Sequence, residues 1–156
     1  MAGKLYKVIE EFEDGIEKIF VDGLGEVEIV YVPGEYADDV LNKSLGIAFY
    51  GKNQILLDES LREEPDFLKY VLCHEIFELY IEPGEDVYKH TTTELANLNY
   101  LKDEEPQAYL NGIEFNLQKL GDGQKSEYTS AFFDDIEKLG EKLNEEIKNK
   151  LYDIAV

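Results

Sequence analysis

The sequence predicts an α+β fold in which strands come first and helices follow. In the first third of the chain, short segments bounded by turn signals predict strands, and residues 26–32 show the period of a half-buried strand, whereas from residue 60 onward the signals are helical. Proline, glycine and acidic turn residues separate these segments. A small, mainly antiparallel sheet packed against helices is therefore expected. The length of 156 residues suits a single domain, spanning 1–156, with one core.

Three strands are expected first, and a hairpin follows them. The strands cover 4–12, 16–21 and 26–32, and the hairpin pairs 46–50 with 54–58 across Gly51-Lys52-Asn53. The third strand shows the pattern most clearly, because Val27, Ile29 and Tyr31 alternate along it and should share one face. A short loop that contains glycine is typical of a hairpin connection.

Helices are expected from residue 35 onward, apart from that hairpin. Their ranges are 35–43, 66–81, about 91–102, 106–121 and 126–152. Ser60-x-x-Glu63 and Thr91-x-x-Glu94 fit capping boxes, which mark the beginnings of helices. The expected apolar contacts of the first helix are Tyr36, Val40 and Leu41.

The net charge of −20 bears on the class of partner. Binding to duplex nucleic acid relies on lysine and arginine side chains that displace counterions from phosphates, so direct nucleic-acid binding is not expected. A nuclease that uses its carboxylates ranks last for the same reason. The acidic residues are spread along the chain, which favours a solvated surface over a basic partner or mimicry of nucleic acid.

Apolar runs and cysteine content indicate a cytoplasmic protein. No apolar run approaches the roughly 20 residues of a membrane-spanning helix, and the first residues lack the apolar stretch of a secretory signal. Cys73 is the sole cysteine, so an internal disulfide framework is excluded, and its apolar surroundings suit a small buried hydrophobe. No membrane partner is expected, and the oligomeric state stays open.

The helix expected from Asp66 to Ile81 carries the candidate site. It is apolar nearly all round, which is typical of a helix in the interior, yet it contains His74, Glu75 and Glu78. An unpaired buried carboxylate costs several kcal/mol, so such groups usually become neutral or find a partner. Carboxylates in this helix therefore call for a functional explanation.

The spacing of these three residues suits metal-assisted hydrolysis. His74 and Glu78 are four positions apart, so their side chains can converge on one divalent cation beside the helix. Glu75 lies one step round the helix, within reach of a water molecule held by that cation. A metal lowers the pKa of such a water toward about 7, and a neighbouring carboxylate can accept its proton.

His74-Glu75-Ile76-Phe77-Glu78 resembles the HExxH signature of zincin metallopeptidases, with glutamate in place of the second histidine. The segment 46–102 is similar in layout to small zincins such as the SprT-like and ImmA/IrrE-like peptidases, which place a strand pair before the active-site helix. This resemblance implies that Glu75 is the general base and that His74 and Glu78 are metal ligands. It also implies a third ligand from the next helix, where His90 ranks ahead of Glu94.

The altered ligand set leaves the metal and the function open. A His/Glu/His set keeps the ligand types of catalytic zinc, the metal we expect, whereas a His/Glu/Glu set favours manganese or iron. The leading function is a small metal-dependent peptidase, whose peptide or protein substrate adds as a strand along the hairpin edge. The alternative is a non-catalytic acidic interaction or inhibitor protein, either a nucleic-acid mimic or a degenerate zincin without metal. Glutamate is so abundant that the motif can also arise by chance.

Overall fold

The computed structural model describes residues 5–12, 15–41, 44–49, 51–80 and 87–121. Within these ranges the fold is α+β, as expected, with a five-stranded sheet and four α-helices. The strands are β1 (Tyr6–Phe12), β2 (Ile16–Val21), β3 (Gly25–Val32), β4 (Gly46–Phe49) and β5 (Gln54–Asp58). The helices are α1 (Gly34–Leu41), α2 (Pro65–Tyr80), α3 (Val87–Glu104) and α4 (Pro106–Gly121), and a 3-10 helix, η1 (Glu59–Glu63), precedes α2. The helix expected over 126–152 lies outside the described residues.

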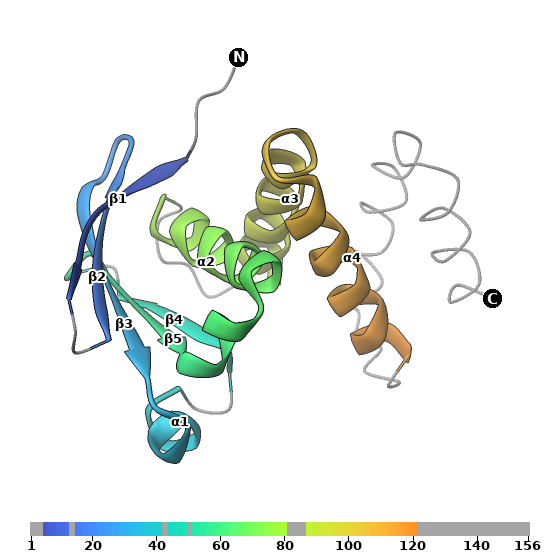
Figure 1. The fold of residues 1–156 in the computed structure, drawn as a ribbon. Coiled ribbons are helices and arrows are strands. Elements are labelled where there is room, and N and C mark those ends of the chain that lie inside the picture. Colours follow the sequence, from blue (N-terminus) through green and yellow to red (C-terminus); the bar gives the residue numbers. More distant parts are fainter. Residues whose placement is uncertain (1–4, 13–14, 42–43, 50, 81–86, 122–156) are drawn as a thin grey trace.

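The sheet is mixed and mostly antiparallel, with the strand order β1-β2-β3-β5-β4 (Figure 1). The exception is the parallel pair of β3 and β5, in which Ile29 lies opposite Ile55 and Tyr31 opposite Leu57. The three expected strands are confirmed as β1, β2 and β3, which pair antiparallel in sequence order, and the expected hairpin is confirmed as β4 and β5. Because β5 lies inside the sheet, β1 and β4 form its two edges.

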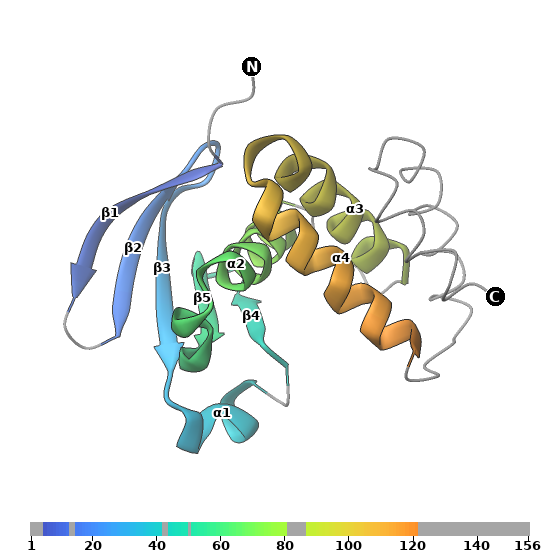
Figure 2. The ribbon, with the colours of Figure 1, turned by 45° about the vertical axis from the view of Figure 1, so that its right-hand side comes forward.

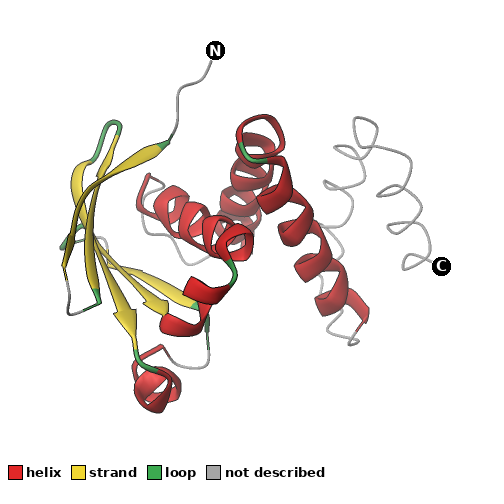
Figure 3. Ribbon diagram, in the orientation of Figure 1, coloured by secondary structure: helices red, strands yellow, loops and turns green. Residues whose placement is uncertain are grey.

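Helix α2 packs against one face of the sheet, and α3 and α4 pack against α2 on the side away from the sheet (Figure 2, Figure 3). Val27, Ile29 and Tyr31 are buried on the α2 side, so their expected alternation is confirmed. The other buried strand residues of this core are Ile19, Val21, Ile55 and Leu57. Helix α2 therefore lies between the sheet and two helices, and it is an interior element.

Helix α1 covers the opposite face of the sheet, where Ala37 and Leu41 pack against Val32. The expectation that Tyr36 and Val40 make apolar contacts is wrong, because these side chains are 54% and 44% exposed. The helix has only eight residues, and the stripe that faces the sheet consists of Ala37 and Leu41, one turn apart.

Neither expected capping box forms. Ser60 lies inside η1, and Asp58 caps that helix by accepting a hydrogen bond from the Ser60 amide at 3.0 Å. An aspartate at the end of a strand is as good an N-cap as serine, so the helix begins earlier. Helix α3 also begins earlier, at Val87, which places Thr91 and Glu94 inside it. None of the helices in the described ranges is long and apolar enough to cross a membrane.

Candidate functional site

The candidate site lies on the buried helix α2. Glu75 is 8% exposed, and the side chains of His74 and Glu78 are 12% and 19% exposed. The prediction that this helix is interior is confirmed, since the sheet covers one side of it and α3 and α4 cover another. All three residues line a cleft beside β4.

The cleft has a volume of about 610 Å³. Residues 44–48, which include the start of β4, form one part of its wall, and α2 forms another. Tyr70, Val71 and Phe115 add apolar surface. The titratable residues that line it, besides Tyr70, are His74, Glu75, Glu78 and Glu94. The fold thus brings together four of the five residues that the sequence singled out, and no lysine or arginine is among the described residues that line the cleft.

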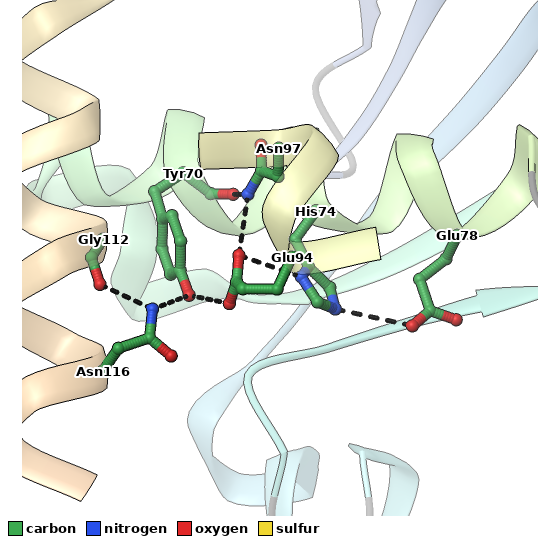
Figure 4. Close-up of polar contacts among 7 residues, drawn as sticks. All are labelled: Tyr70, His74, Glu78, Glu94, Asn97, Gly112 and Asn116. Carbon is green, nitrogen blue, oxygen red and sulfur yellow. Dashed lines mark hydrogen bonds and ion pairs between the residues drawn. The ribbon is translucent and has the colours of Figure 1, made fainter. Parts of the chain in front are cut away.

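His74 has a carboxylate at each of its two ring nitrogens (Figure 4). Its Nε2 lies 3.5 Å from Oε1 of Glu78, and its Nδ1 lies 3.4 Å from Oε1 of Glu94. Burial alone would lower the pKa of His74, but the charge of Glu94 and the contacts with both glutamates raise it well above its usual value. The two carboxylates therefore favour the protonated form of the ring.

Glu94 is more deeply buried than Glu78, with 5% of its side chain exposed. Its Oε2 accepts a hydrogen bond from the Tyr70 hydroxyl, and its Oε1 accepts one from Nδ2 of Asn97 at 3.3 Å. Burial alone would raise the pKa of Glu94, but the charge of His74 and the hydrogen bonds to this carboxylate lower it well below its usual range. Glu94 is therefore ionised at neutral pH despite its burial.

Helix α4 reaches this arrangement through Asn116. Its Nδ2 lies 3.3 Å from the hydroxyl oxygen of Tyr70 and donates to the Gly112 carbonyl at 2.8 Å. Asn97 adds a second connection, because its Nδ2 also donates to the Tyr70 carbonyl at 3.1 Å. Side chains from α2, α3 and α4 thus form one network around Glu94 (Figure 4).

No sequence motif marks Tyr70, Asn97 or Asn116 as a site residue. Tyr70 lies one turn before His74 and Asn97 lies one turn after Glu94, so helical spacing offered a signal for both. Asn116 offered no such signal, because it is 46 positions from Tyr70 and meets it only through the packing of α4 on α2.

Glu75 faces the cleft beside the start of β4. A Cβ atom at Gly46 would lie 3.2 Å from Cγ of Glu75, so the absence of a side chain there makes room for the glutamate. No described residue donates a hydrogen bond to the Glu75 carboxylate. Burial raises its pKa to about 7, with the charge of His74 opposing this shift and those of Glu78 and Glu94 adding to it. A carboxyl that titrates near neutrality can accept and return a proton.

His90 lies in the first turn of α3, but its side chain is outside the described part of the chain. Among the residues that are described, no group of three or more histidine, cysteine, aspartate or glutamate side chains is placed to hold a metal ion. Glu94 lies at one ring nitrogen of His74, and Glu78 lies at the other. Two candidate ligands, His74 and Glu78, remain side by side.

Comparisons with known proteins supply no relative from which a function can be transferred. No family model matches the chain, and neither a curated protein nor a solved structure matches it. The likeness to zincins therefore rests on the residues of α2 and on the hairpin that precedes it.

Proposed function

We propose that the chain is a small zincin-like, metal-dependent hydrolase that cleaves peptide bonds. One observation carries the proposal: Nε2 of His74 and Oε1 of Glu78 lie 3.5 Å apart at a cleft that also holds the Glu75 carboxylate. These are two candidate ligands and one candidate base, all on a single buried helix.

The two candidate ligands suit a divalent cation. Bonds of roughly 2.0–2.2 Å in a tetrahedral zinc site place neighbouring ligand atoms about 3.3–3.6 Å apart. The separation of 3.5 Å between His74 Nε2 and Glu78 Oε1 falls within this range. Glu78 is the more exposed partner of His74, 19% against 5% for Glu94, so its side of the ring has more room for water or substrate. A catalytic metal site requires such an open position.

Each group has one task in this proposal. His74 and Glu78 would hold a divalent cation, which would supply Lewis acidity toward a substrate carbonyl and toward water. Glu75 accepts the proton of the attacking water at its carboxylate and returns it to the leaving amine.

The substrate lies along β4 in this proposal. β4 is an edge strand, and residues 46–48 of it line the cleft. An extended peptide can add to such an edge through main-chain hydrogen bonds, which position its carbonyls without requiring one particular sequence. Leu45 and Val71 then offer apolar contacts to its side chains.

The first test is the metal content of untagged protein, measured by mass spectrometry. Wild type and Glu75→Gln should each retain about one metal ion per chain, whereas His74→Ala should lose it. Asp103→Asn is the matched control, because Asp103 is exposed on α3. Glu75→Gln should then fail to cleave an unfolded protein substrate that wild type cleaves. A wild type that stays metal-free after incubation with zinc, manganese or iron would contradict the proposal.

The second candidate function is that of a non-catalytic acidic interaction protein. The observation in its favour is that His74 has a carboxylate at each ring nitrogen, so both nitrogens already have a partner within the protein. Such a protein would use its net charge of −20 to bind a basic partner that handles nucleic acid. Binding of this kind weakens steeply with added salt and survives His74→Ala, whereas peptide hydrolysis does not survive it.

A further inference from the structure

We infer that Glu94 is a positioning residue and not a metal ligand: it holds the His74 ring at Nδ1, so that Nε2 faces Glu78. Tyr70 and Asn97 hold Glu94 in turn. The inference rests on the proposed function, because the orientation of His74 matters for activity only if Nε2 binds a metal. Nδ1 of His74 lies 3.4 Å from Oε1 of Glu94.

The placement of the two carboxylates decides which ring nitrogen serves the cation. Glu78 and Glu94 lie at different nitrogens of His74 (Figure 4). The lone pairs of Nδ1 and Nε2 diverge in the plane of the ring, so a cation at one nitrogen is out of reach of a carboxylate at the other. A histidine that binds a metal commonly donates its other N–H to a carboxylate, which fixes the ring and its proton. Glu94 occupies that second position.

The hydrogen bonds of Glu94 argue against a cation on its own side of the ring. Its Oε2 accepts the Tyr70 hydroxyl, and its Oε1 is shared between Nδ1 of His74 and Nδ2 of Asn97. A cation there would displace buried hydrogen bonds, and a buried donor left without its acceptor is costly. Glu78 is more exposed than Glu94, 19% against 5%, so its side of the ring is more accessible to a cation from solvent.

Three helices determine where Glu94 lies. Tyr70 comes from α2, Glu94 and Asn97 come from α3, and Asn116 of α4 lies within 3.3 Å of the Tyr70 hydroxyl. A side chain held by several such partners keeps its orientation better than one held by a single contact. The orientation of His74 is therefore determined by the packing of three helices and not by α2 alone.

NMR signals of the His74 ring N–H groups test which nitrogen binds the metal. The sample is the full chain with nitrogen-15 histidine, before and after zinc is added, and His74→Ala identifies the His74 signals. Without metal we expect two ring N–H signals, one that moves in Glu94→Gln and one that moves in Glu78→Gln. Zinc should abolish the Nε2–H signal and leave Nδ1–H. Loss of Nδ1–H with Nε2–H retained would overturn the inference.

Zinc affinity and the visible spectrum of the cobalt-loaded protein separate positioning from ligation. Glu94→Gln and Tyr70→Phe should each weaken zinc binding by about 10–100-fold, the usual effect of losing an outer-shell partner. Their cobalt absorption bands should keep the wild-type positions, because the ligands are unchanged. Asp103→Asn, also on α3, should leave both measurements unaltered. Cobalt bands that shift in Glu94→Gln as they do in Glu78→Gln would identify Glu94 as a ligand and overturn the inference.

The NMR spectra recorded before zinc is added distinguish failure of this inference from failure of the proposed function. A wild type that binds no zinc contradicts the metal site, whereas an Nδ1–H signal that moves in Glu94→Gln still supports the positioning contact. An Nδ1–H signal that stays in place in both Glu94→Gln and Tyr70→Phe overturns the inference whatever the metal content. Tyr70→Phe keeps the aromatic ring in the core, so it provides the test if Glu94→Gln does not fold.

Discussion

Tyr70 packs so closely against Gly112 that a Cβ atom added at the glycine would lie 2.5 Å from Cδ1 of the tyrosine ring. Leu98 bounds the same space at 3.1 Å. Gly112 lies within α4, where glycine is less favourable than alanine by about 1 kcal/mol. The close approach of α4 to α2 explains its presence, and it also brings Asn116, one turn further along, to the Tyr70 hydroxyl.

Gly112→Ala should destabilise the fold, the opposite of the usual effect of alanine in a helix. The added methyl group meets an aromatic ring and a leucine, and overpacking of this kind costs about 1–3 kcal/mol. Urea unfolding measures the change. Gly51→Ala is the control, because its Cβ would meet nothing within 4 Å and the change should stay within about 0.5 kcal/mol. A Gly112→Ala protein as stable as wild type would show that the interface between α2 and α4 has room for a methyl group, against the 2.5 Å approach of the Tyr70 ring.

Zinc binding should strengthen as the pH rises. His74 has to release its Nε2 proton to a metal, and the surrounding carboxylates raise the pKa of His74. Protons therefore compete with zinc at neutral pH, and the affinity should increase by up to about tenfold per pH unit. Competition titrations between about pH 6 and about pH 8 measure this slope. An affinity that does not change over that interval would show that zinc does not bind at His74.

The fold class and the residues of α2 could be predicted because their signals are local. Val27, Ile29 and Tyr31 show a strand with one buried face from their alternation alone. His74 and Glu78 lie on one helix, so their spacing fixes how close their side chains can come. Each of these predictions needs only the regular spacing of side chains along one strand or one helix.

The surroundings of His74 depend on contacts between helices, and the spacing of residues within one helix does not predict such contacts. Tyr70 and Glu94 are 24 positions apart, and their hydrogen bond exists only because α3 packs on α2. The same fact explains the wrong capping prediction for Glu94. A glutamate three residues after a threonine has the local pattern of a capping box, but its carboxylate is instead buried among side chains of α2.

Glu17→Gln should stabilise the fold at neutral pH. Glu17 is 7% exposed, and Glu11 lies opposite it on β1. Burial and the charge of Glu11 raise the pKa of Glu17, although Arg62 and a hydrogen bond from Tyr31 oppose the shift. A carboxyl whose pKa is higher in the folded state than in the unfolded state costs stability once the pH is high enough to ionise it. Glutamine removes this cost and still offers Tyr31 an acceptor.

The benefit of Glu17→Gln should shrink as the pH falls, because the wild-type carboxyl then becomes neutral as well. Thermal unfolding at neutral and at mildly acidic pH measures the difference between the two proteins. Glu10→Gln, which changes an exposed residue of β1, controls for the loss of one negative charge. A Glu17→Gln protein that is less stable than wild type at neutral pH would mean that the ionised carboxylate stabilises this part of the sheet.

Cys73 should react with thiol reagents only when the chain opens. The residue is 1% exposed, as its apolar surroundings in the sequence predicted, and burial, with a smaller effect of Glu105, raises the pKa of the thiol to about 12. The thiolate is the reactive form, so both its access and its ionisation are suppressed. Labelling by an aromatic disulfide should be slow in native buffer and should accelerate steeply with urea. Labelling in native buffer at the rate of a free cysteine would contradict the burial. Because Cys73 directly precedes His74 on α2, slow labelling would also indicate that the helix bearing the candidate site stays packed between the sheet and α3.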